Sequence, residues 1–593
     1  MIKLSDYVFQ FLERKGIRHA FMLPGGGAMH LDDSLGRSNI EYICFLHEQG
    51  AAIAAEAYGQ HTNTPGVVLV TSGPGATNAI TGVTAGWIDS TPMIIISGQS
   101  KRADLVGDKG VRQIGSQEVQ IIPMITPITK YAVQILEPSE IRYHLERAYY
   151  EATTGRPGPV WLDIPLDVQA VMLDESTLEG YEVEDDREIS IDKEIIQIVE
   201  LLKNAKKPLV LVGNGIKLAE GTDFLYSLLD LLGIPVETTW KTIDMFGENA
   251  EYYVGHPGIM GDRGANLILQ EADLILSIGC RLDTSVTAFN DNNFGKSAKK
   301  VIVDIDDNEI KRMDVDKAVA VACDAKLFLQ QLLSQVEGNL EEIVTVTRQK
   351  EWKEWLSYCK MLRAKYPIIT EEHAAAKDYV SAYYFIGKLC ELLQEDDVIV
   401  PESSGGAGEI TYQAFRLKKG QKMKNAAGLG SMGFGLPYAI GSCIANNRRR
   451  TILINGDGAF QLNIQELETL HRLKLPVKMF IWNNDGYASI RSMQRNNFGG
   501  HYVASEKDSG LTMPNISNVA AAYGFETYRI HNNRELDELL PEIMKDNTPL
   551  LCEIMVLPEE TVSPRVKALV GENGKMMSGP LEKMWPYIDE TEG

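Results

Sequence analysis

"INGDGAFQLNIQELETLHRLKLPVKMFIWNND" occupies residues 454–485, and two polar clusters in it directly follow two apolar runs. Gly456-Asp457-Gly458 follows the run TILIN, and Asn483-Asn484 follows the run VKMFIW. Short apolar runs on either side of a helical segment predict two buried parallel strands that are joined by a crossover helix. We expect that helix to begin at Asn463, with Glu466 completing a capping box.

The two polar clusters predict a metal and diphosphate site. In open α/β sheets, ligands bind beyond the carboxyl ends of the strands, and both Asp457 and Asn484 lie at such ends. A carboxylate, an amide oxygen and backbone carbonyls are hard ligands that suit Mg²⁺ when the ion also contacts a diphosphate. The glycines at 456 and 458 would allow the phosphates to approach the backbone closely.

The same alternation of strands and helices occurs in three stretches of the chain. A length of 593 residues exceeds what one core usually supports, which is about 250–300 residues. We therefore predict three doubly wound α/β domains with parallel sheets, at residues 1–170, 190–345 and 370–560. The tail at residues 561–593 lacks the alternation; it either packs on the surface or forms a flap over an active site.

Composition excludes several classes of partner. The net charge is −23 and the pI is about 5.0, which argues against binding to nucleic acid or to an anionic membrane. No apolar run approaches the roughly 18 residues that a membrane span requires, and the N-terminus does not resemble a secretory signal. The seven cysteines are scattered and form no C-x-x-C pair, so we expect reduced thiols in a cytoplasmic protein.

Three further motifs identify a family. They are "GLGSMGFGLPYAIG" (428–441), "HEQGAAIAAEAYG" (47–59) and "VTSGPGATNAITG" (70–82). Together with GDG followed by NN, they resemble the thiamine diphosphate enzymes of the acetolactate (acetohydroxyacid) synthase and pyruvate oxidase–decarboxylase superfamily. The likeness covers nearly the whole chain. It implies that the three domains are a pyrimidine-binding, a central and a diphosphate-binding domain.

The resemblance also implies residue roles. Glu48 would be catalytic, with its carboxyl bound to N1′ of the cofactor's aminopyrimidine, and Met432 would bend the cofactor into a V. The carbonyl of Gly430 would accept from the 4′-amino group. Asp457, Asn484 and the carbonyl of Gly486 would bind Mg²⁺. The remaining cofactor contacts would be Pro24, Gly25, Thr71, Pro74, Asn78 and Gln117 on the pyrimidine side, and Gly405, Gly406, Gly456, Gly458, Ala459 and Tyr487 on the diphosphate side.

Some positions depart from the synthase pattern. Ser116 and Met493 stand where the synthases carry aromatic residues in the acceptor pocket, so we expect a larger or more polar pocket. In the central domain, "RLDTSVT" (281–287) keeps Arg281 and Asp283 of the synthases' FAD motif, but Ser285 replaces its second arginine. Whether FAD is bound is left open.

The resemblance implies a thiamine diphosphate- and Mg²⁺-dependent lyase or transferase. It would decarboxylate a 2-oxo acid, first of all pyruvate, and join the remaining unit to a carbonyl acceptor, as acetolactate synthases do. The alternatives are transfer to a keto-sugar nucleotide or another larger ketone in surface-polysaccharide synthesis, and hydrolysis of a cyclic 1,2-dione. The resemblance further implies a homodimer or homotetramer with active sites between subunits. An inactive regulatory subunit is disfavoured because Glu48, Asp457 and Asn484 are all present.

Overall fold

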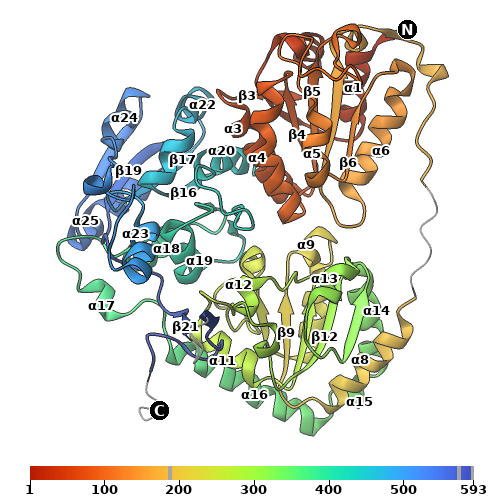
Figure 1. Ribbon diagram of the computed structural model, residues 1–593. Helices are drawn as coiled ribbons and strands as arrows, with labels where there is room; N and C mark the ends of the chain where they lie inside the picture. The colour runs from red at the N-terminus through yellow and green to blue at the C-terminus, as the bar shows by residue number, and fades with distance from the viewer. Residues whose placement is uncertain (184–189, 571–575, 589–593) are drawn as a thin grey trace. The chain divides into compact units, whose positions relative to one another are not determined.

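The computed structural model describes residues 1–183, 190–570 and 576–588, and it divides into two units. The first unit comprises Met1–Asp185, Asp396–Gly408 and Lys422–Glu559, and it contains two six-stranded sheets (Figure 1). The second comprises Asp186–Glu395, Glu409–Gln421 and Glu560–Gly593, and it contains a five-stranded sheet.

The N-terminal sheet is entirely parallel and has the order β3-β2-β4-β5-β7-β6. Val68 and Ile95 lie in the hydrophobic cluster that also contains residues of α3 and α4, whereas Val67 and Ile94 lie in the cluster that contains residues of α1, α2 and α6. Alternate residues of each strand therefore bury opposite faces, as a doubly wound sheet requires. The elements are α1 (Leu4–Arg14), β2 (His19–Met22), α2 (Met29–Arg37), β3 (Glu41–Cys44), α3 (Glu48–Thr62), β4 (Gly66–Val70), α4 (Pro74–Asp89), β5 (Met93–Gln99), β6 (Tyr131–Gln134), α6 (Ile141–Thr153) and β7 (Pro159–Pro165).

The second sheet of this unit has the order β15-β14-β16-β17-β19-β18 and is also parallel. β16 and β17 are direct neighbours, with Gly456 opposite Trp482, so the pairing predicted from residues 454–485 is confirmed. The elements are β14 (Val398–Pro401), α19 (Gly406–Ala414), β15 (Lys422–Met423), α20 (Gly435–Ala445), β16 (Thr451–Gly456), α21 (Asp457–Phe460), α22 (Glu466–Leu473), β17 (Val477–Asn483), α23 (Ala488–Phe498), α24 (Ile516–Ala522), β18 (Glu526–Ile530), α25 (Asn533–Met544) and β19 (Leu550–Met555).

The predicted capping box at Asn463 is wrong. The crossover begins with the short helix α21, and the longer helix α22 begins only at Glu466, with Gln465 as its N-cap. The Asn463 side chain donates instead to the carbonyl of Gly433 at 2.7 Å. The carboxylate of Glu466 accepts from the amide of Leu46, in the other domain of the unit.

Helices α3 and α20 pack closely and join the two domains of the first unit (Figure 1). A Cβ atom added at Gly441 would lie 2.2 Å from the carbonyl oxygen of Ala54, so only glycine allows this approach. His61 Nε2 lies 3.1 Å from Ser442 Oγ in the same interface.

The second unit is built on a parallel sheet of order β10-β9-β11-β12-β13. With three parallel sheets covered by helices, the predicted fold class is confirmed. The elements are α8 (Asp192–Asn204), β9 (Pro208–Val212), α10 (Thr222–Leu232), β10 (Val236–Thr238), α11 (Arg263–Glu271), β11 (Leu274–Ile278), α12 (Thr284–Thr287), β12 (Lys299–Asp304), β13 (Val319–Ala322), α14 (Ala325–Gly338), α16 (Val346–Lys365) and α18 (Ala382–Leu392).

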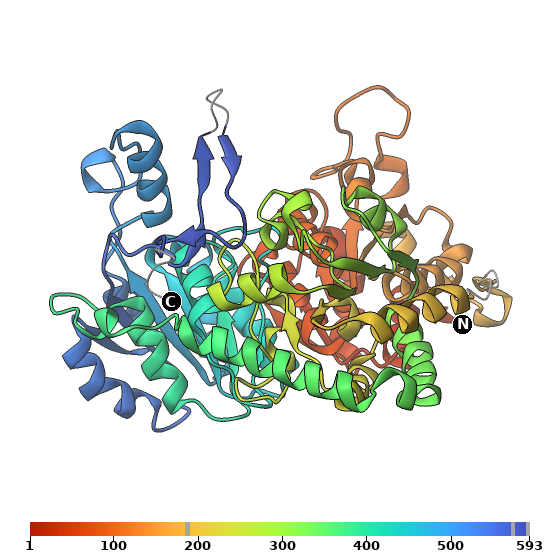
Figure 2. The same ribbon diagram turned by 90° about the horizontal axis from the view of Figure 1, so that it is seen from below.

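The C-terminal tail packs on this central domain. β20 (Arg565–Val566) pairs with β23 (Met584–Trp585), and β21 (Ala568–Val570) pairs with β22 (Met576–Ser578) in a projecting hairpin (Figure 2). Met584 is buried in the domain's core, and Glu582 accepts from Lys296 at 2.6 Å. The flap remains a prediction, and the parts of it at residues 571–575 and 589–593 lie outside the described residues.

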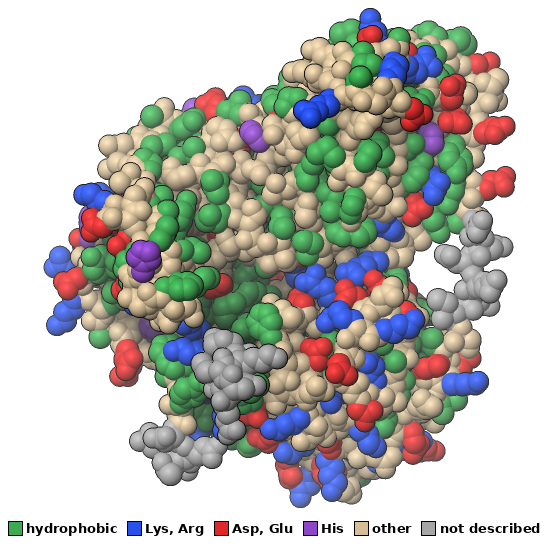
Figure 3. Space-filling model, viewed as in Figure 1, with side chains coloured by type: hydrophobic (Ala, Val, Ile, Leu, Met, Phe, Trp, Pro, Cys, Tyr) green, Lys and Arg blue, Asp and Glu red, His purple; other side chains and the backbone are tan. Residues whose placement is uncertain are grey.

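All seven cysteines are free thiols in the structure, and six of them are buried. Within the described residues, no helix combines the length and apolar character that would let it cross a membrane. On the face of the second unit that Figure 3 shows, basic and acidic side chains are interspersed.

Candidate active site

Glu48 is the first residue of α3, and its side chain is only 8% exposed. Asn78 Nδ2 donates to Glu48 Oε2 at 3.0 Å. A Cβ at Gly75 would lie 3.5 Å from Glu48 Oε1. The carboxylate is therefore held in a largely dry setting by residues of the pyrimidine-side motif "GPGATN" (73–78).

The loop that follows β2 packs against Thr71, which directly follows β4. Thr71 Oγ1 accepts from the amide of Gly27 at 3.0 Å, and a Cβ at Gly25 would lie 2.5 Å from Thr71. Asp32 accepts from the amide of Gly25 at 3.1 Å, and burial raises the pKa of Asp32 to about 6. The predicted residues Pro24, Gly25 and Thr71 are therefore next to each other in the structure.

Gln117 has a φ of 60°, a left-handed backbone that is uncommon for a residue with a side chain. Its carbonyl oxygen would lie 2.3 Å from a Cβ at Gly73, directly before Pro74. Glu118 is 5% exposed and accepts from the amides of Ile114 and Gly115 at 3.0 and 3.1 Å. Glu118 thus fixes the loop that brings Gln117 to the start of α4.

Asp457 and Asn484 meet at the carboxyl ends of β16 and β17. Asp457 is 1% exposed; its Oδ1 accepts from Gly458 N at 2.9 Å and its Oδ2 from Gly486 N at 3.0 Å. Burial raises the pKa of Asp457 to about 7, against the lowering effect of these two amides. Among the residues that the structure describes, buried Asn484 Oδ1 has no hydrogen-bond partner. A carboxylate and an orphaned amide oxygen are a donor set that fits Mg²⁺.

Of the two glycines beside Asp457, one borders open space and the other is packed against a ring. A Cβ at Gly456 would meet nothing within 4 Å, so there is room next to the backbone for a diphosphate. A Cβ at Gly458 would lie 2.5 Å from the Tyr487 ring, which therefore packs directly on the glycine. Ala459 is buried in α21, one residue further along.

Met432 lies on the loop before α20 and is 41% exposed, so its apolar side chain is open to a ligand. Gly430, two residues earlier, has a φ of +63°, and Gly405 has a φ of +69° and approaches Ser489 Oγ. Gly406 begins α19. An exposed apolar side chain next to open backbone fits a bound cofactor with an apolar ring.

Two buried glutamates were missed as site residues. Glu466 accepts from the amide of Leu46 at 3.2 Å and from Thr469 Oγ1 at 2.6 Å, and burial raises its pKa. It therefore holds the segment that leads into Glu48. Glu402 accepts from the amides of Ser403 and Gly435 at 3.0 Å each, and burial raises its pKa to about 7.

The residues kept from the FAD motif have partners within the chain. Arg281 pairs with Asp283 at 2.6 Å, and Asp283 caps α12 through the amides of Ser285 and Val286. Their presence thus has a structural reason that does not require a flavin.

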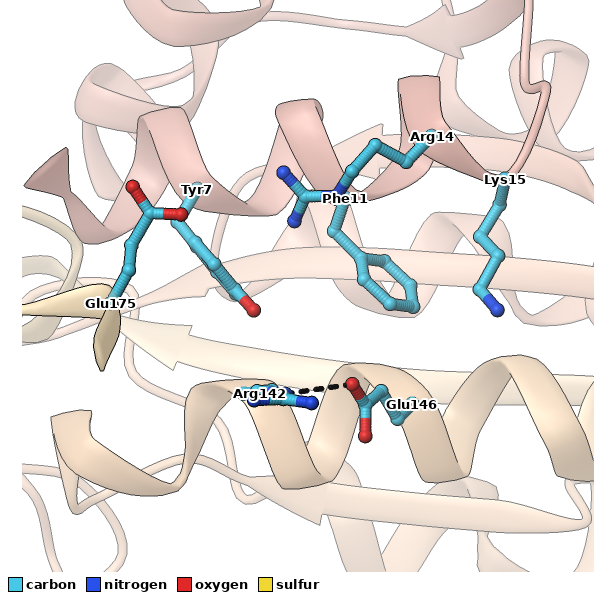
Figure 4. A pocket seen from close by; sticks show the side chains of 7 residues that line it. All are labelled: Tyr7, Phe11, Arg14, Lys15, Arg142, Glu146 and Glu175. Atoms are coloured by element: carbon cyan, nitrogen blue, oxygen red, sulfur yellow. Dashed lines mark hydrogen bonds and ion pairs between the residues drawn. The ribbon is translucent and has the colours of Figure 1, made fainter. Parts of the chain in front are cut away.

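A cavity of about 370 Å³ lies between α1 and α6 (Figure 4). Neither Glu48 nor Asp457 lines it. Two of its charged residues pair with each other, since Arg142 Nε donates to Glu146 Oε1 at 2.8 Å. It is lined by Tyr7, Phe11, Arg14, Lys15, Arg142, Glu146 and Glu175.

The chain has three parallel-sheet domains. One carries the buried carboxylate of Glu48, and another carries Asp457 and Asn484 at its strand ends. This combination is typical of α/β enzymes that bind a diphosphate cofactor. The thiamine pyrophosphate enzyme models match at residues 2–122 for the N-terminal TPP binding domain, 195–332 for the central domain and 404–554 for the C-terminal TPP binding domain. The chain belongs to this family of thiamine diphosphate-dependent enzymes, as its motifs predicted.

Its relatives include acetolactate synthases. The chain is 30% identical over 578 residues to an acetolactate synthase large subunit of Porphyra purpurea, covering 95% of this chain and 93% of the relative. It is 31% identical over 577 residues to that of Lactococcus lactis, covering 95% and 94%. It is also 31% identical over 577 residues to the chloroplastic acetolactate synthase of Arabidopsis thaliana, covering 95% and 83%.

Proposed function

We propose that this enzyme decarboxylates pyruvate and joins the two-carbon unit to a second carbonyl compound, and that a second pyruvate is the acceptor, giving acetolactate. The observation that carries the proposal is the buried carboxylate of Glu48, at the start of α3, which accepts a hydrogen bond from Asn78. Identity of about 30% to acetolactate synthases along nearly the whole chain supports the same reaction.

Thiamine diphosphate, when bound, supplies a carbon centre that adds to the 2-oxo acid and stabilises the negative charge left after carbon dioxide departs. Glu48 would hold a proton at N1′ of the aminopyrimidine, and Asn78 keeps the carboxyl directed for that contact. Met432 would support the bent cofactor, with Gly430 accepting from its amino group. Low exposure around Glu48 would keep water away from the reacting atoms.

Asp457, Asn484 and the carbonyl of Gly486 would bind Mg²⁺, which would in turn hold the diphosphate. The unpartnered Asn484 Oδ1 supports this assignment, because burying an unpaired polar atom is unfavourable unless something binds it. Gly456, Gly458 and Ala459 would lie along the phosphates, with Gly456 leaving room for them.

The residues of the chain limit the identity of the acceptor substrate less than that of the cofactor. Met493 is 54% exposed and Ser116 is exposed, at positions where the synthases carry aromatic side chains. Loss of such a contact changes discrimination between substrates by roughly 1–3 kcal/mol. A keto-sugar nucleotide or other larger ketone is therefore the alternative acceptor to be tested.

The test incubates the purified protein with thiamine diphosphate, Mg²⁺ and pyruvate, with and without larger ketones, and follows both carbon dioxide and the coupled product. Acetolactate formation from pyruvate alone supports the proposal. Release of carbon dioxide only when a larger ketone is present would assign the alternative acceptor, and no release under any condition would reject the reaction.

We also propose a homo-oligomer in which Glu48 of one subunit serves the diphosphate site of another. Two inactive variants, Glu48→Gln and Asp457→Ala, test this when they are mixed under conditions of subunit exchange. A mixed dimer would contain one intact site if sites are shared between subunits, so activity should reappear. Continued inactivity, despite exchange confirmed by mass, would place each site within one chain.

A further inference from the structure

The loop after β17 has a backbone that needs support. Asp485 has a φ of 60° and Gly486 a φ of 126°, so two successive residues lie in the left-handed region between Asn484 and Tyr487. For a non-glycine residue this conformation is unfavourable and persists only where surrounding contacts enforce it. The same loop carries two of the proposed Mg²⁺ ligands.

Arg491, one turn into α23, supplies such contacts. Its Nη2 donates to the carbonyl of Asn484 at 2.7 Å, and its Nη1 donates to the carbonyl of Asp485 at 2.9 Å. The same two nitrogens reach the carbonyls of Pro558 at 3.3 Å and Ser505 at 3.4 Å. One guanidinium therefore ties the loop to two other segments.

The burial of Arg491 makes these bonds informative. The residue is only 5% exposed, and all four of these hydrogen bonds go to backbone carbonyls. Burying a charged side chain is unfavourable unless hydrogen bonds compensate it. Here the compensation comes from four backbone carbonyls, two in the loop and two in other segments. The positive charge of Arg491 also favours the ionised form of Asp457, because it acts to lower the pKa of that carboxyl.

We propose that Arg491 is a positioning residue for the metal site: by fixing the carbonyls of Asn484 and Asp485, it orients Asn484 Oδ1 and the Gly486 backbone toward the ion. This inference rests on the Mg²⁺ assignment in the proposed function. Arginine suits the role because its planar fork reaches two carbonyls with each terminal nitrogen, whereas a lysine ammonium offers a single centre.

The test is Mg²⁺ affinity, measured by calorimetry on the full chain at saturating thiamine diphosphate. Arg491→Met removes all four bonds and should weaken Mg²⁺ binding by about 10- to 100-fold, the usual effect of losing a residue that orients a metal ligand. Arg491→Lys should bind with intermediate affinity, and it carries the test if the methionine variant does not fold. Half-maximal activation by Mg²⁺ should shift in parallel, while the maximal rate at saturating Mg²⁺ falls less.

Arg495→Met is the matched control, since Arg495 lies on the same helix and pairs at the surface with Glu559. It should leave Mg²⁺ affinity unchanged. An Mg²⁺ affinity equal to that of the wild type in Arg491→Met would overturn the inference. If the melting temperature of the metal-free variant then fell, the role of Arg491 would be purely structural. If the wild type binds Mg²⁺ but forms no coupled product, the proposed function fails while the role of Arg491 still stands.

Discussion

Asn78 and Glu48 come from consecutive helices of one domain, and the Asn78 amide donates to the Glu48 carboxylate at 3.0 Å. Glu48 is the first residue of α3 and Asn78 lies in the first turns of α4, so the helix–strand–helix unit α3-β4-α4 sets the geometry. This bond uses Glu48 Oε2, so Glu48 Oε1 is left for a second contact. Glu48 Oε1 lies beside Gly75, where a larger residue would come close to it. The carboxylate is thus positioned before any ligand binds.

Glu48→Gln should retain Mg²⁺-dependent cofactor binding yet lower the rate of product formation by roughly 10²- to 10⁴-fold, the usual contribution of a positioned proton-transfer group. The amide is nearly isosteric, so binding contacts survive while the proton can no longer be shared. Coupled product formation and calorimetric cofactor binding measure the two effects separately. The exposed Glu137→Gln is the control, and near-normal turnover in Glu48→Gln would remove that residue from its role.

Asn484→Ala should weaken Mg²⁺ binding by more than about tenfold, because losing even a residue that only supports a ligand has that effect. The melting temperature of the metal-free chain should hardly change, since Asn484 Oδ1 has no partner to lose among the described residues. Calorimetric titration with Mg²⁺ at saturating cofactor provides the measurement. Asp508→Ala, a substitution at an exposed position of the same domain, should leave the Mg²⁺ affinity unchanged. An unchanged Mg²⁺ affinity in Asn484→Ala would show that Asn484 is not a metal ligand.

The strands on either side of residues 457–476 could be predicted from the sequence because each apolar run and each glycine turn is a local signal. The adjacency of β16 and β17 follows from one crossover helix. The role of Glu466 could not be predicted, because its carboxylate bonds the amide of Leu46, 420 residues earlier in the chain. A capping box competes with such a tertiary partner, and no local pattern indicates which one prevails. The same holds for Arg491, whose carbonyl partners come from three separate segments.

Glu402→Gln should change how stability depends on pH. The pKa of Glu402 is about 7 in the folded chain against an ordinary 4.5, because burial disfavours the charged form. Between these values the folded state binds the proton more strongly, so this group's stabilising effect is full below pH 4.5 and is lost as the pH rises to 7. At about 1.4 kcal/mol per pKa unit, the variant should gain about 3 kcal/mol relative to wild type across that range.

Melting temperatures at several pH values test this prediction, with the exposed Glu468→Gln as the matched control. The difference between variant and wild type isolates Glu402 from other carboxyl groups, such as Asp163, whose pKa burial raises to about 6. A difference that stays constant from pH 4.5 to 7.5 would mean that Glu402 does not titrate in this range.

Gly441→Ala should loosen the packing of α3 on α20. The added methyl would lie 2.2 Å from the carbonyl oxygen of Ala54, a backbone atom in the middle of a buried helix that cannot rotate away. Overpacking of this kind destabilises a protein by about 1–3 kcal/mol, and calorimetry should record a lower melting temperature. Gly36→Ala is the control, because a Cβ there meets nothing within 4 Å in helix α2, and alanine is favoured over glycine in a helix by up to about 1 kcal/mol. Equal melting temperatures for the two variants would show that the helices can separate without loss. Such a result would also remove the reason to expect that the domain carrying Glu48 is held rigidly on the domain carrying Asp457.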